Sequence, residues 1–381
     1  MKIIGLIAEY NPFHLGHLYQ IKKIKELYPD SLIILITNSC FTQRGDISIL
    51  TRNDKTKIAL DNQIDLIVEL PFAYATQSAD IFAYGALKIL NHLKIDTLIF
   101  GSETNNVEEI IKIANTQLNN KEYDKLVKQY ISTGINYPTA LNKALSQIIK
   151  TTIKEPNDLL ALSYIKEIIK NNYPITPISI KRIGSYHEKE IHNTFANATL
   201  IREKFLQNEP INKYIPKNEE HLLIKNFSLN NYFEFLKYKI ISTKDLSIYQ
   251  TVDEGIENKI KKEIINCTSW EELIMKIKSK RYTYNKINRM LIHILNSFTK
   301  EEAQKIKIDY IKILGFNQKG QKYLNKIKKE LKLPIIYNYK KNKSLLLDIE
   351  QRAISLYNLK LPTEKQINEY QQKPIIKTDA Q

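Results

Sequence analysis

A chain of 381 residues, 43% of them hydrophobic, is long enough for about two domains, because single hydrophobic cores rarely grow past ~250 residues. Its formal net charge of +16 favours a polyanionic partner, and its longest apolar runs are too short to span a bilayer. The polar turn soon after the N-terminus argues against a signal peptide, and two isolated cysteines, Cys40 and Cys267, argue against a disulfide framework or a zinc site, so a cytoplasmic location is expected.

The first 205 residues alternate between apolar runs typical of strands and segments with helical spacing. Strands are predicted at 2–8, 31–37, 65–70, 96–100 and 176–180, and helices at 15–27, 53–62 and 79–93, with several more between 107 and 171. Strands that are apolar along their whole length indicate a parallel sheet covered on both faces. We therefore predict an α/β fold with a Rossmann-like, doubly wound parallel sheet that binds ligands at the carboxyl ends of its strands.

Residues 206–381 are predicted to form a second, mostly α-helical domain, with a boundary near 205–215. Helical patterns fall at 219–242, 256–293, 299–307, 317–331 and 345–356, residues 308–313 are ambiguous but strand-like, and the polar tail after 361 is expected to be frayed. The first 205 residues hold 24 basic and 21 acidic side chains, whereas the rest hold 33 and 20. This asymmetry favours nucleic acid as the partner over a coding bias that would add lysine everywhere.

The sharpest local signal is residues 7–17 (IAEYNPFHLGH), which join the first predicted strand to the first predicted helix. Such a junction presents backbone N–H groups and the positive end of a helix dipole to an anion. His14 and His17 can project together and stabilise charge on the α-phosphate and on leaving pyrophosphate. Gly16 permits close approach to a phosphate, and Pro12 turns the loop. The competing interpretation is that both histidines only cap and pack the helix.

Residues 197–202 (NATLIR) can hold the other side of a triphosphate. Thr199 offers a hydroxyl near a helix N-terminus, and Arg202 offers a positive charge three residues later. The competing interpretation is an ordinary helix N-cap followed by a solvent-facing Arg202.

These motifs belong to a pattern that runs along the whole chain. Its strings lie at 7–20 (IAEYNPFHLGHLYQ), 43–46 (QRGD), 65–72 (DLIVELPF), 78–83 (SADIFA), 100–103 (FGSE), 156–158 (PND), 181–184 (KRIG), 186–187 (YH), 197–202 (NATLIR), 280–283 (KRYT) and 314–317 (LGFN). With them the chain resembles the bacterial tRNA(Met) cytidine acetate ligase family of the HxGH nucleotidyltransferase superfamily.

The resemblance implies a two-step ligase. ATP and acetate would form acetyl-adenylate and pyrophosphate, and the acetyl group would pass to N4 of the wobble cytidine in elongator tRNA(Met). His14 and His17 are implied as catalytic. The implied ATP-binding positions, with Thr199 and Arg202 added from the second motif, are Ile7, Ala8, Glu9, Tyr10, Asn11, Pro12, Phe13, His14, Leu15, Gly16, His17, Leu18, Tyr19, Gln20, Gly101, Asn157 and Arg182. Arg44 is expected either to hold acetate or a phosphate, or to point to solvent.

Acetate is ionised at neutral pH and needs no general base. The reaction requires a positioned and neutralised triphosphate, for which we expect Mg²⁺. The sequence contains no carboxylate cage for this ion, so phosphates and water are expected to hold it and no metal-binding residue is predicted.

RNA binding is predicted mainly at residues 276–289 (KIKSKRYTYNKINR), which hold six basic residues and two tyrosines. Basic side chains would contact phosphates and tyrosines would stack on anticodon-loop bases, with tRNA contacts expected from Lys278, Lys280, Arg281, Tyr282, Lys286 and Arg289. The competing interpretation is a solvated helix face with its tyrosines in the core. Residues 326–329 (KIKK) form a weaker patch, and Trp270 is expected in the core.

Two other functions compete with the ligase. A small-molecule adenylyltransferase would leave the positive charge of the second half unexplained. A non-catalytic RNA-binding protein would have no need of the intact set His14, Gly16, His17 and Arg202. No oligomeric state is predicted.

Overall fold

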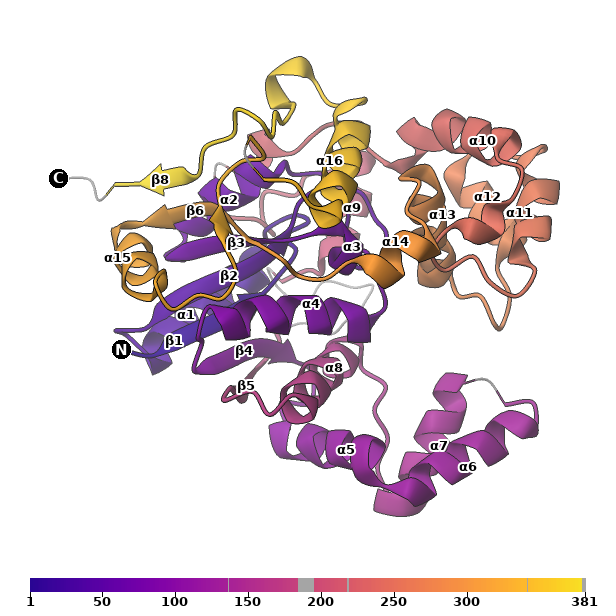
Figure 1. Ribbon diagram of the computed structural model, residues 1–381, viewed down its shortest axis with the longest axis horizontal. Helices are drawn as coiled ribbons and strands as arrows, with labels where there is room; N and C mark the ends of the chain where they lie inside the picture. Colours follow the sequence, from indigo (N-terminus) through magenta and orange to yellow (C-terminus); the bar gives the residue numbers. More distant parts are fainter. Residues whose placement is uncertain (136, 184–194, 218, 341, 379–381) are drawn as a thin grey trace.

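The computed structural model describes residues 1–135, 137–183, 195–217, 219–340 and 342–378 (Figure 1). Its sheet has the order β5-β4-β1-β2-β3-β6-β7, with β8 paired to β6. The strands are β1 (Ile3–Ile7), β2 (Leu32–Asn38), β3 (Leu66–Leu70), β4 (Thr97–Ser102), β5 (Thr176–Lys181), β6 (Ile311–Asn317), β7 (Ile335–Ile336) and β8 (Ile375–Lys377).

Helices cover both faces of this sheet and form two groups beside it (Figure 1). In the first half they are α1 (Leu15–Leu27), α2 (Arg52–Asp61), α3 (Phe72–Ala75), α4 (Ala79–His92), α5 (Val107–Asn119), α6 (Lys121–Ser132), α7 (Tyr137–Ile149), α8 (Pro156–Lys170) and α9 (Ala198–Leu206). In the second half they are α10 (Phe233–Ser242), α11 (Ile256–Ile264), α12 (Trp270–Ile277), α13 (Tyr284–Leu295), α14 (Lys300–Lys305), α15 (Gln318–Ile327) and α16 (Leu345–Asn358). Short 3-10 turns lie at Glu220–Leu222, Leu229–Tyr232, Leu246–Ile248 and Thr363–Lys365. Among the described residues, no helix is long and apolar enough to cross a membrane.

The predicted Rossmann-like sheet is confirmed. Strands β5, β4, β1, β2 and β3 are parallel neighbours, with Ile4 opposite Ile33 and Ile36 opposite Val68. Successive strand side chains point to opposite faces, so Ile33 and Ile34 enter different cores. Because both faces of β1 to β4 are covered, most of their positions are apolar, and these apolar runs made the strands recognisable in the sequence.

The second half of the chain completes the sheet. The ambiguous segment at 308–313 leads into β6, which pairs antiparallel with β3. The expectation of a frayed tail is wrong, because β8 pairs with β6 and Glu369 is 1% exposed. Residues on both sides of the predicted boundary therefore share one sheet, and the functional division into 1–205 and 206–381 stays a prediction.

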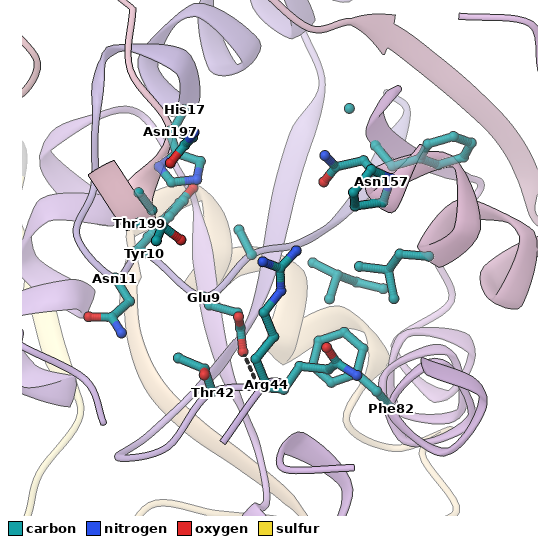
Figure 2. Close-up of a pocket in the computed structure, with 18 of the residues that line it drawn as sticks. Glu9, Tyr10, Asn11, His17, Thr42, Arg44, Phe82, Asn157, Asn197 and Thr199 are labelled. Atoms are coloured by element: carbon teal, nitrogen blue, oxygen red, sulfur yellow. Dashed lines mark hydrogen bonds between the residues drawn. The ribbon is translucent and has the colours of Figure 1, made fainter. Parts of the chain in front are cut away.

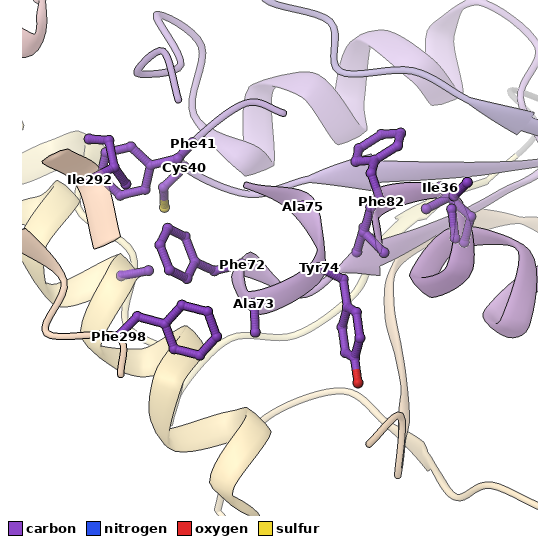
Figure 3. Packing of buried hydrophobic residues seen from close by; sticks show 14 of the residues in the cluster. Ile36, Cys40, Phe41, Phe72, Ala73, Tyr74, Ala75, Phe82, Ile292 and Phe298 are labelled. Carbon is purple, nitrogen blue, oxygen red and sulfur yellow. The ribbon is translucent and has the colours of Figure 1, made fainter. Parts of the chain in front are cut away.

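A helical unit, α10–α14, lies beside the sheet (Figure 1). The predicted continuous helix at 256–293 is instead three helices, because the chain breaks twice: Ser269 is the N-cap of α12 and Thr283 is the N-cap of α13. The predicted helix at 219–242 is α-helical only in α10. Phe298 of this unit packs against Phe72 at a ring-centroid distance of 6.0 Å (Figure 3). An apolar contact thus seats the helical unit on the sheet.

His293 on α13 makes stability dependent on pH. Its side chain is buried, Nε2 lies 2.7 Å from the Thr76 carbonyl oxygen, and burial lowers its pKa to about 4. Below its ordinary pKa of about 6.5 the unfolded chain binds this proton and the folded chain does not. The free energy of unfolding should therefore fall as pH drops from 6.5 towards 4, by about 2 kcal/mol at pH 5 for this residue.

Urea unfolding at pH 7 and pH 5 checks this expectation. His293→Gln should show a smaller difference between the two pH values than the parent protein, whereas a variant of the exposed His221, His221→Gln, should keep the full difference. An equal pH dependence in the parent protein and His293→Gln would contradict it.

Candidate active site

A buried, strained loop joins β1 to α1. Tyr10 adopts a left-handed φ of 47°, uncommon for a bulky side chain. Its ring is 2% exposed and lies 4.8 Å from the ring centroids of both Phe13 and His17. Asn11 ties the loop to a neighbouring segment, donating to the Ile47 carbonyl at 2.9 Å and accepting from the Ile49 N–H at 2.9 Å. Packing and hydrogen bonds together hold the loop in one conformation.

His14 and His17 both cap α1 and line a cavity. The Gly16 N–H donates to His14 Nδ1 at 3.1 Å, and the His14 N–H donates to His17 Nδ1 at 3.3 Å. Both residues therefore make capping contacts and also face the cavity, so capping does not exclude a role there, and their catalytic role stays a prediction. A neutral ring that accepts at Nδ1 carries its proton on Nε2, which leaves a donor for an anion. Gly16 leaves room for this arrangement, because a Cβ there would lie 2.9 Å from the His14 ring.

Both imidazoles are neutral at pH 7. Burial lowers the pKa of His14 to about 3, with Arg182 and Arg202 adding to the effect. Burial also lowers the pKa of His17 well below its usual value, and the neighbouring His14 and Arg182 lower it further. The site therefore offers neutral N–H donors beside two arginine cations, an environment that favours a polyanion.

Residues 197–202 form the adjacent wall. Asn197 caps α9 by accepting from the Leu200 N–H at 2.9 Å, as the capping interpretation expected. A solvent-facing Arg202 is wrong, since its side chain is 17% exposed. Arg202 donates to the Asn11 carbonyl at 2.7 Å, to Asp46 Oδ2 at 3.0 Å and to Thr199 Oγ1 at 3.4 Å. The two motifs thus meet, although 191 residues separate Asn11 from Arg202.

The opposite wall forms where β4 and β5 end. Gly101 lies against Arg182, and a Cβ on Gly101 would sit 3.1 Å from Arg182 Cγ. Asn157, at the start of α8, hydrogen-bonds to Glu103, which also pairs with Arg182 at 3.8 Å. Asp158 accepts from the two backbone N–H groups that follow β4, at 3.2 and 3.1 Å, and so fixes α8 to the strand end. The matching positions Gly184, Tyr186 and His187 lie outside the described residues.

A tight turn at 42–46 closes the third side. The Gly45 N–H donates to the Thr42 carbonyl at 2.9 Å, and Gly45 has a φ of +84°, which glycine adopts without strain. The Gln43 N–H donates to Glu9 at 2.6 Å, and burial raises the pKa of this carboxyl. Arg44 points into the cavity between the two walls (Figure 2), so the cavity-facing alternative for Arg44 agrees with the structure.

Together these walls enclose a cavity of about 280 Å³. The implied ATP-binding residues that line it are Ile7, Ala8, Glu9, Tyr10, Asn11, His14, His17, Gln20, Gly101, Asn157, Arg182, Thr199 and Arg202. The remaining implied positions stand outside this lining, namely Pro12, Phe13, Leu15, Gly16, Leu18 and Tyr19. Lining residues that were not predicted as site residues include Thr42, Ala79, Phe82, Phe100, Leu159, Leu160 and Tyr164. Tyr164 lies seven residues after Asn157, on the same face of α8, and this spacing was the available signal.

The predicted RNA patch lies on the helical unit, at the turn between α12 and α13. Lys278 and Lys280 are exposed there, and neither has an ion pair among the described residues. Arg281 pairs with Glu254 at 2.5 Å. The predicted stacking role of Tyr282 does not fit, because the ring is 6% exposed, its hydroxyl donates to the Asp253 carbonyl, and the core interpretation is the better one here.

Two further basic residues extend this patch. Lys286 Nζ lies 4.3 Å from the centroid of the Tyr282 ring. Arg289 is half-buried beside the turn at 42–46, and burial, followed by the charge of Arg44, lowers its pKa to about 10.

Trp270 is 3% exposed, as expected for a core residue. The weaker patch at 326–329 lies at the end of α15, across the sheet from the helical unit (Figure 1).

The described residues contain no cluster of three or more His, Cys, Asp or Glu side chains suited to a metal ion. Glu9 and Asp46 are the carboxylates that line the cavity, and each already accepts hydrogen bonds from protein groups. This part of the chain therefore does not supply a ligand cage of its own.

Comparison with known proteins finds relatives that match nearly the whole length of this chain. The HIGH Nucleotidyl Transferase family matches residues 1–373. The tRNA(Met) cytidine acetate ligase of Caldicellulosiruptor saccharolyticus is 38% identical over 379 residues, covering 94% of each chain. The protein of the same name from Bacillus subtilis is 34% identical over 403 residues, covering 98% of this chain and 97% of its own.

Solved structures agree with these sequence relatives. The crystal structure of Thermotoga maritima TmcAL (apo, form I) superimposes with a TM-score of 0.92 at 26% identity, covering both chains completely. The structure of the same protein bound with alpha-thio ATP gives a TM-score of 0.90.

Proposed function

The chain belongs to the HIGH nucleotidyl transferase family and, within it, to the tRNA(Met) cytidine acetate ligases, and from this premise we propose that it activates acetate with ATP and acetylates N4 of the wobble cytidine in elongator tRNA(Met). One observation carries the proposal. A single cavity collects the imidazoles of His14 and His17 and the guanidinium of Arg202 at the N-termini of two helices, beside a basic helical unit.

The triphosphate end of ATP is assigned to the wall formed by α1 and α9. Helix N-termini favour negative charge, and Thr199 and Arg202 supply a hydroxyl and a cation there. The Nε2–H groups of His14 and His17 would donate to phosphate oxygens as charge develops on pyrophosphate. Such preorganised donors act most strongly on a transition state in a buried site.

The adenosine end is assigned to the wall with Gly101, Asn157 and Arg182, where β4 and β5 end. In an open α/β sheet, ligands bind outside the carboxyl ends of the strands. Arg44 lies between the two ends (Figure 2), where a cation can hold the acetate carboxylate beside the α-phosphate. The cation offsets the repulsion between the two anions. Holding them next to each other makes their reaction effectively intramolecular.

The chemistry follows from this placement. An acetate oxygen attacks the α-phosphorus, and pyrophosphate departs with the electron pair of the broken P–O bond. The cytidine N4 then attacks the acetyl carbonyl carbon, AMP departs, and N4 loses one proton. Mg²⁺ would enter with the ATP phosphates, since the described carboxylates form no cage for it, and every protein role above is independent of it.

Binding of tRNA is assigned to the exposed turn between α12 and α13. Replacing Lys278 and Lys280 by glutamine should weaken tRNA binding about tenfold at low salt and reduce the slope of log Kd against log salt by about 1 to 2. Replacing Lys326 and Lys329 by glutamine removes the same charge from the far side and should leave the Kd within about twofold. Equal losses of tRNA affinity in both double variants would show that tRNA binding depends only on the overall charge of the protein.

The reaction itself is tested by following AMP and pyrophosphate release from ATP. We expect AMP release to require both acetate and tRNA. The amount of AMP released should equal the amount of acetyl groups found on RNA. ATP turnover that ignores acetate and responds to a small phosphorylated acceptor would instead identify a small-molecule adenylyltransferase.

A further inference from the structure

One buried asparagine connects the helical unit to the wall of the cavity. Asn288 on α13 is 0% exposed, and its Oδ1 accepts from the indole N–H of Trp270 at 2.7 Å. Its Nδ2 donates to the Arg44 carbonyl and to Asp46 Oδ1, each at 3.2 Å. Both Asn288 partners on the cavity side belong to the turn at 42–46, while Trp270 belongs to α12. The amide therefore bridges two parts of the chain that are more than 200 residues apart in sequence.

The connection continues into the phosphate wall. Asp46 uses one carboxylate oxygen for Asn288 and the other for Arg202, which lies 3.0 Å away. Arg202 in turn donates to the Asn11 carbonyl of the loop before α1. The orientation of the Asp46 carboxylate is thus set from one side by Asn288 and sets the guanidinium of Arg202 on the other.

The backbone of the turn is built for this contact. A Cβ on Gly45 would lie 2.7 Å from the Arg289 backbone nitrogen, so only glycine lets the turn approach α13 this closely. The φ of +84° at Gly45 also favours glycine. Close approach brings the short Asn288 side chain within reach of Asp46.

The chemistry of an amide explains the residue type. Asn288 accepts from Trp270 and donates towards a carboxylate, and only a side chain with both a donor and an acceptor can do this. An aspartate of the same shape would still accept from Trp270 but would place a second carboxylate against Asp46. Two carboxylates at this distance, one fully buried and one 29% exposed, would repel each other, and the Asp46–Arg202 pair would be displaced.

We propose that Asn288 is a positioning residue of the ligase, holding Asp46 and through it Arg202 at the phosphate end of the cavity. The inference rests on the proposed function only in that the cavity binds ATP. It makes α13 part of the construction of the ATP site as well as a carrier of the RNA-binding surface.

The test compares variants by ATP affinity, measured calorimetrically without acetate or RNA, alongside tRNA affinity and melting temperature. Asn288→Asp should weaken ATP binding about tenfold and leave the tRNA Kd within about twofold. The swap Asn288→Asp with Asp46→Asn restores a donor facing an acceptor and should recover ATP affinity to within about threefold of the parent protein. Asn230→Asp is the matched control, because exposed Asn230 accepts from the Trp270 backbone N–H at 3.1 Å and does not touch the turn.

Three results would overturn the inference. These are unchanged ATP binding in Asn288→Asp, a swap that is no better than the single variants, and an equal loss in Asn230→Asp. Should Asn288→Asp fail to fold, Asn288→Ser, which shortens the reach to Asp46 without adding charge, should weaken ATP binding about fivefold, and unchanged affinity there would also overturn it. A parent protein that binds ATP but acetylates no RNA would remove the proposed function and leave this inference standing.

Discussion

Replacing His14 by asparagine, or His17 by glutamine, is expected to leave a folded protein whose acetyl-adenylate formation falls by about 100- to 1000-fold. Both substitutions keep an acceptor where Nδ1 now caps α1, because asparagine is a good N-cap and glutamine at the third position completes a capping box. Both replace the rigid imidazole by an amide, whose N–H groups are not held at the position from which the imidazole Nε2–H faces the cavity. The loss of acetyl-adenylate formation would therefore come from weaker stabilisation of the phosphates rather than from a destabilised N-terminus of α1.

The measurement is single-turnover formation of acetyl-adenylate, accompanied by a melting curve for each variant. Melting temperatures should stay within about 4 °C of the parent protein, the shift expected for a change of about 1 kcal/mol. His14→Ala, which loses the cap and the donor together, should lose both activity and stability. If His14→Asn and His17→Gln retain full activity, the histidines serve only as caps.

Replacing Lys312 by methionine is expected to lower the free energy of unfolding by about 3–5 kcal/mol, because it leaves the buried carboxylates of Glu69 and Glu369 with only Arg52 as a shared counter-charge. Lys312 on β6 is 1% exposed, pairs with Glu69 at 3.4 Å, and is hydrogen-bonded to Tyr339 at 3.2 Å. It also pairs with Glu369 of the C-terminal segment. Although burial alone would raise the pKa of Glu369, Arg52 and Lys312 hold it below its usual value, so this carboxyl is charged at neutral pH.

Urea denaturation at pH 7 measures the effect, with Lys94→Met as the matched control. Lys94 pairs with Glu330 at the surface, where the two side chains are 46% and 62% exposed, and its loss should cost less than about 1 kcal/mol. The double variant Lys312→Met with Glu369→Gln should regain part of the stability, because it removes one of the stranded charges. Equal losses for Lys312→Met and Lys94→Met would show that the buried network contributes nothing beyond a surface pair.

Buried ion pairs also mark the limit of what could be predicted from the sequence. Strands β1 to β4 were predictable because each is buried on both faces and therefore mostly apolar along its length. Strand β6 was ambiguous because Lys312 lies in it, and a lysine in a central strand makes sense only with partners from elsewhere in the chain. The order of the tail depends likewise on Glu369 meeting Arg52, which precedes it by more than 300 residues. Such pairings are set by tertiary structure and leave no local pattern.

The candidate site divides in the same way. Its two motifs were predictable, because each combines residue types suited to phosphate with a helix start. The sequence could only suggest that the two motifs lie together, and the hydrogen bond from Arg202 to the Asn11 carbonyl in the folded chain joins them. The role of Asn288 had no local signal at all, since an asparagine within a basic segment looks like any solvated residue.

The most direct measurement is transfer of radiolabelled acetate to RNA. Purified protein would be incubated with ATP, labelled acetate and total tRNA, and the RNA digested to nucleosides and separated. We expect label in N4-acetylcytidine, dependent on ATP, confined to elongator tRNA(Met), and lost in the His14→Asn and His17→Gln variants. An RNA fraction without label, from a folded protein that binds ATP, would contradict the assignment of this chain as a tRNA-acetylating enzyme.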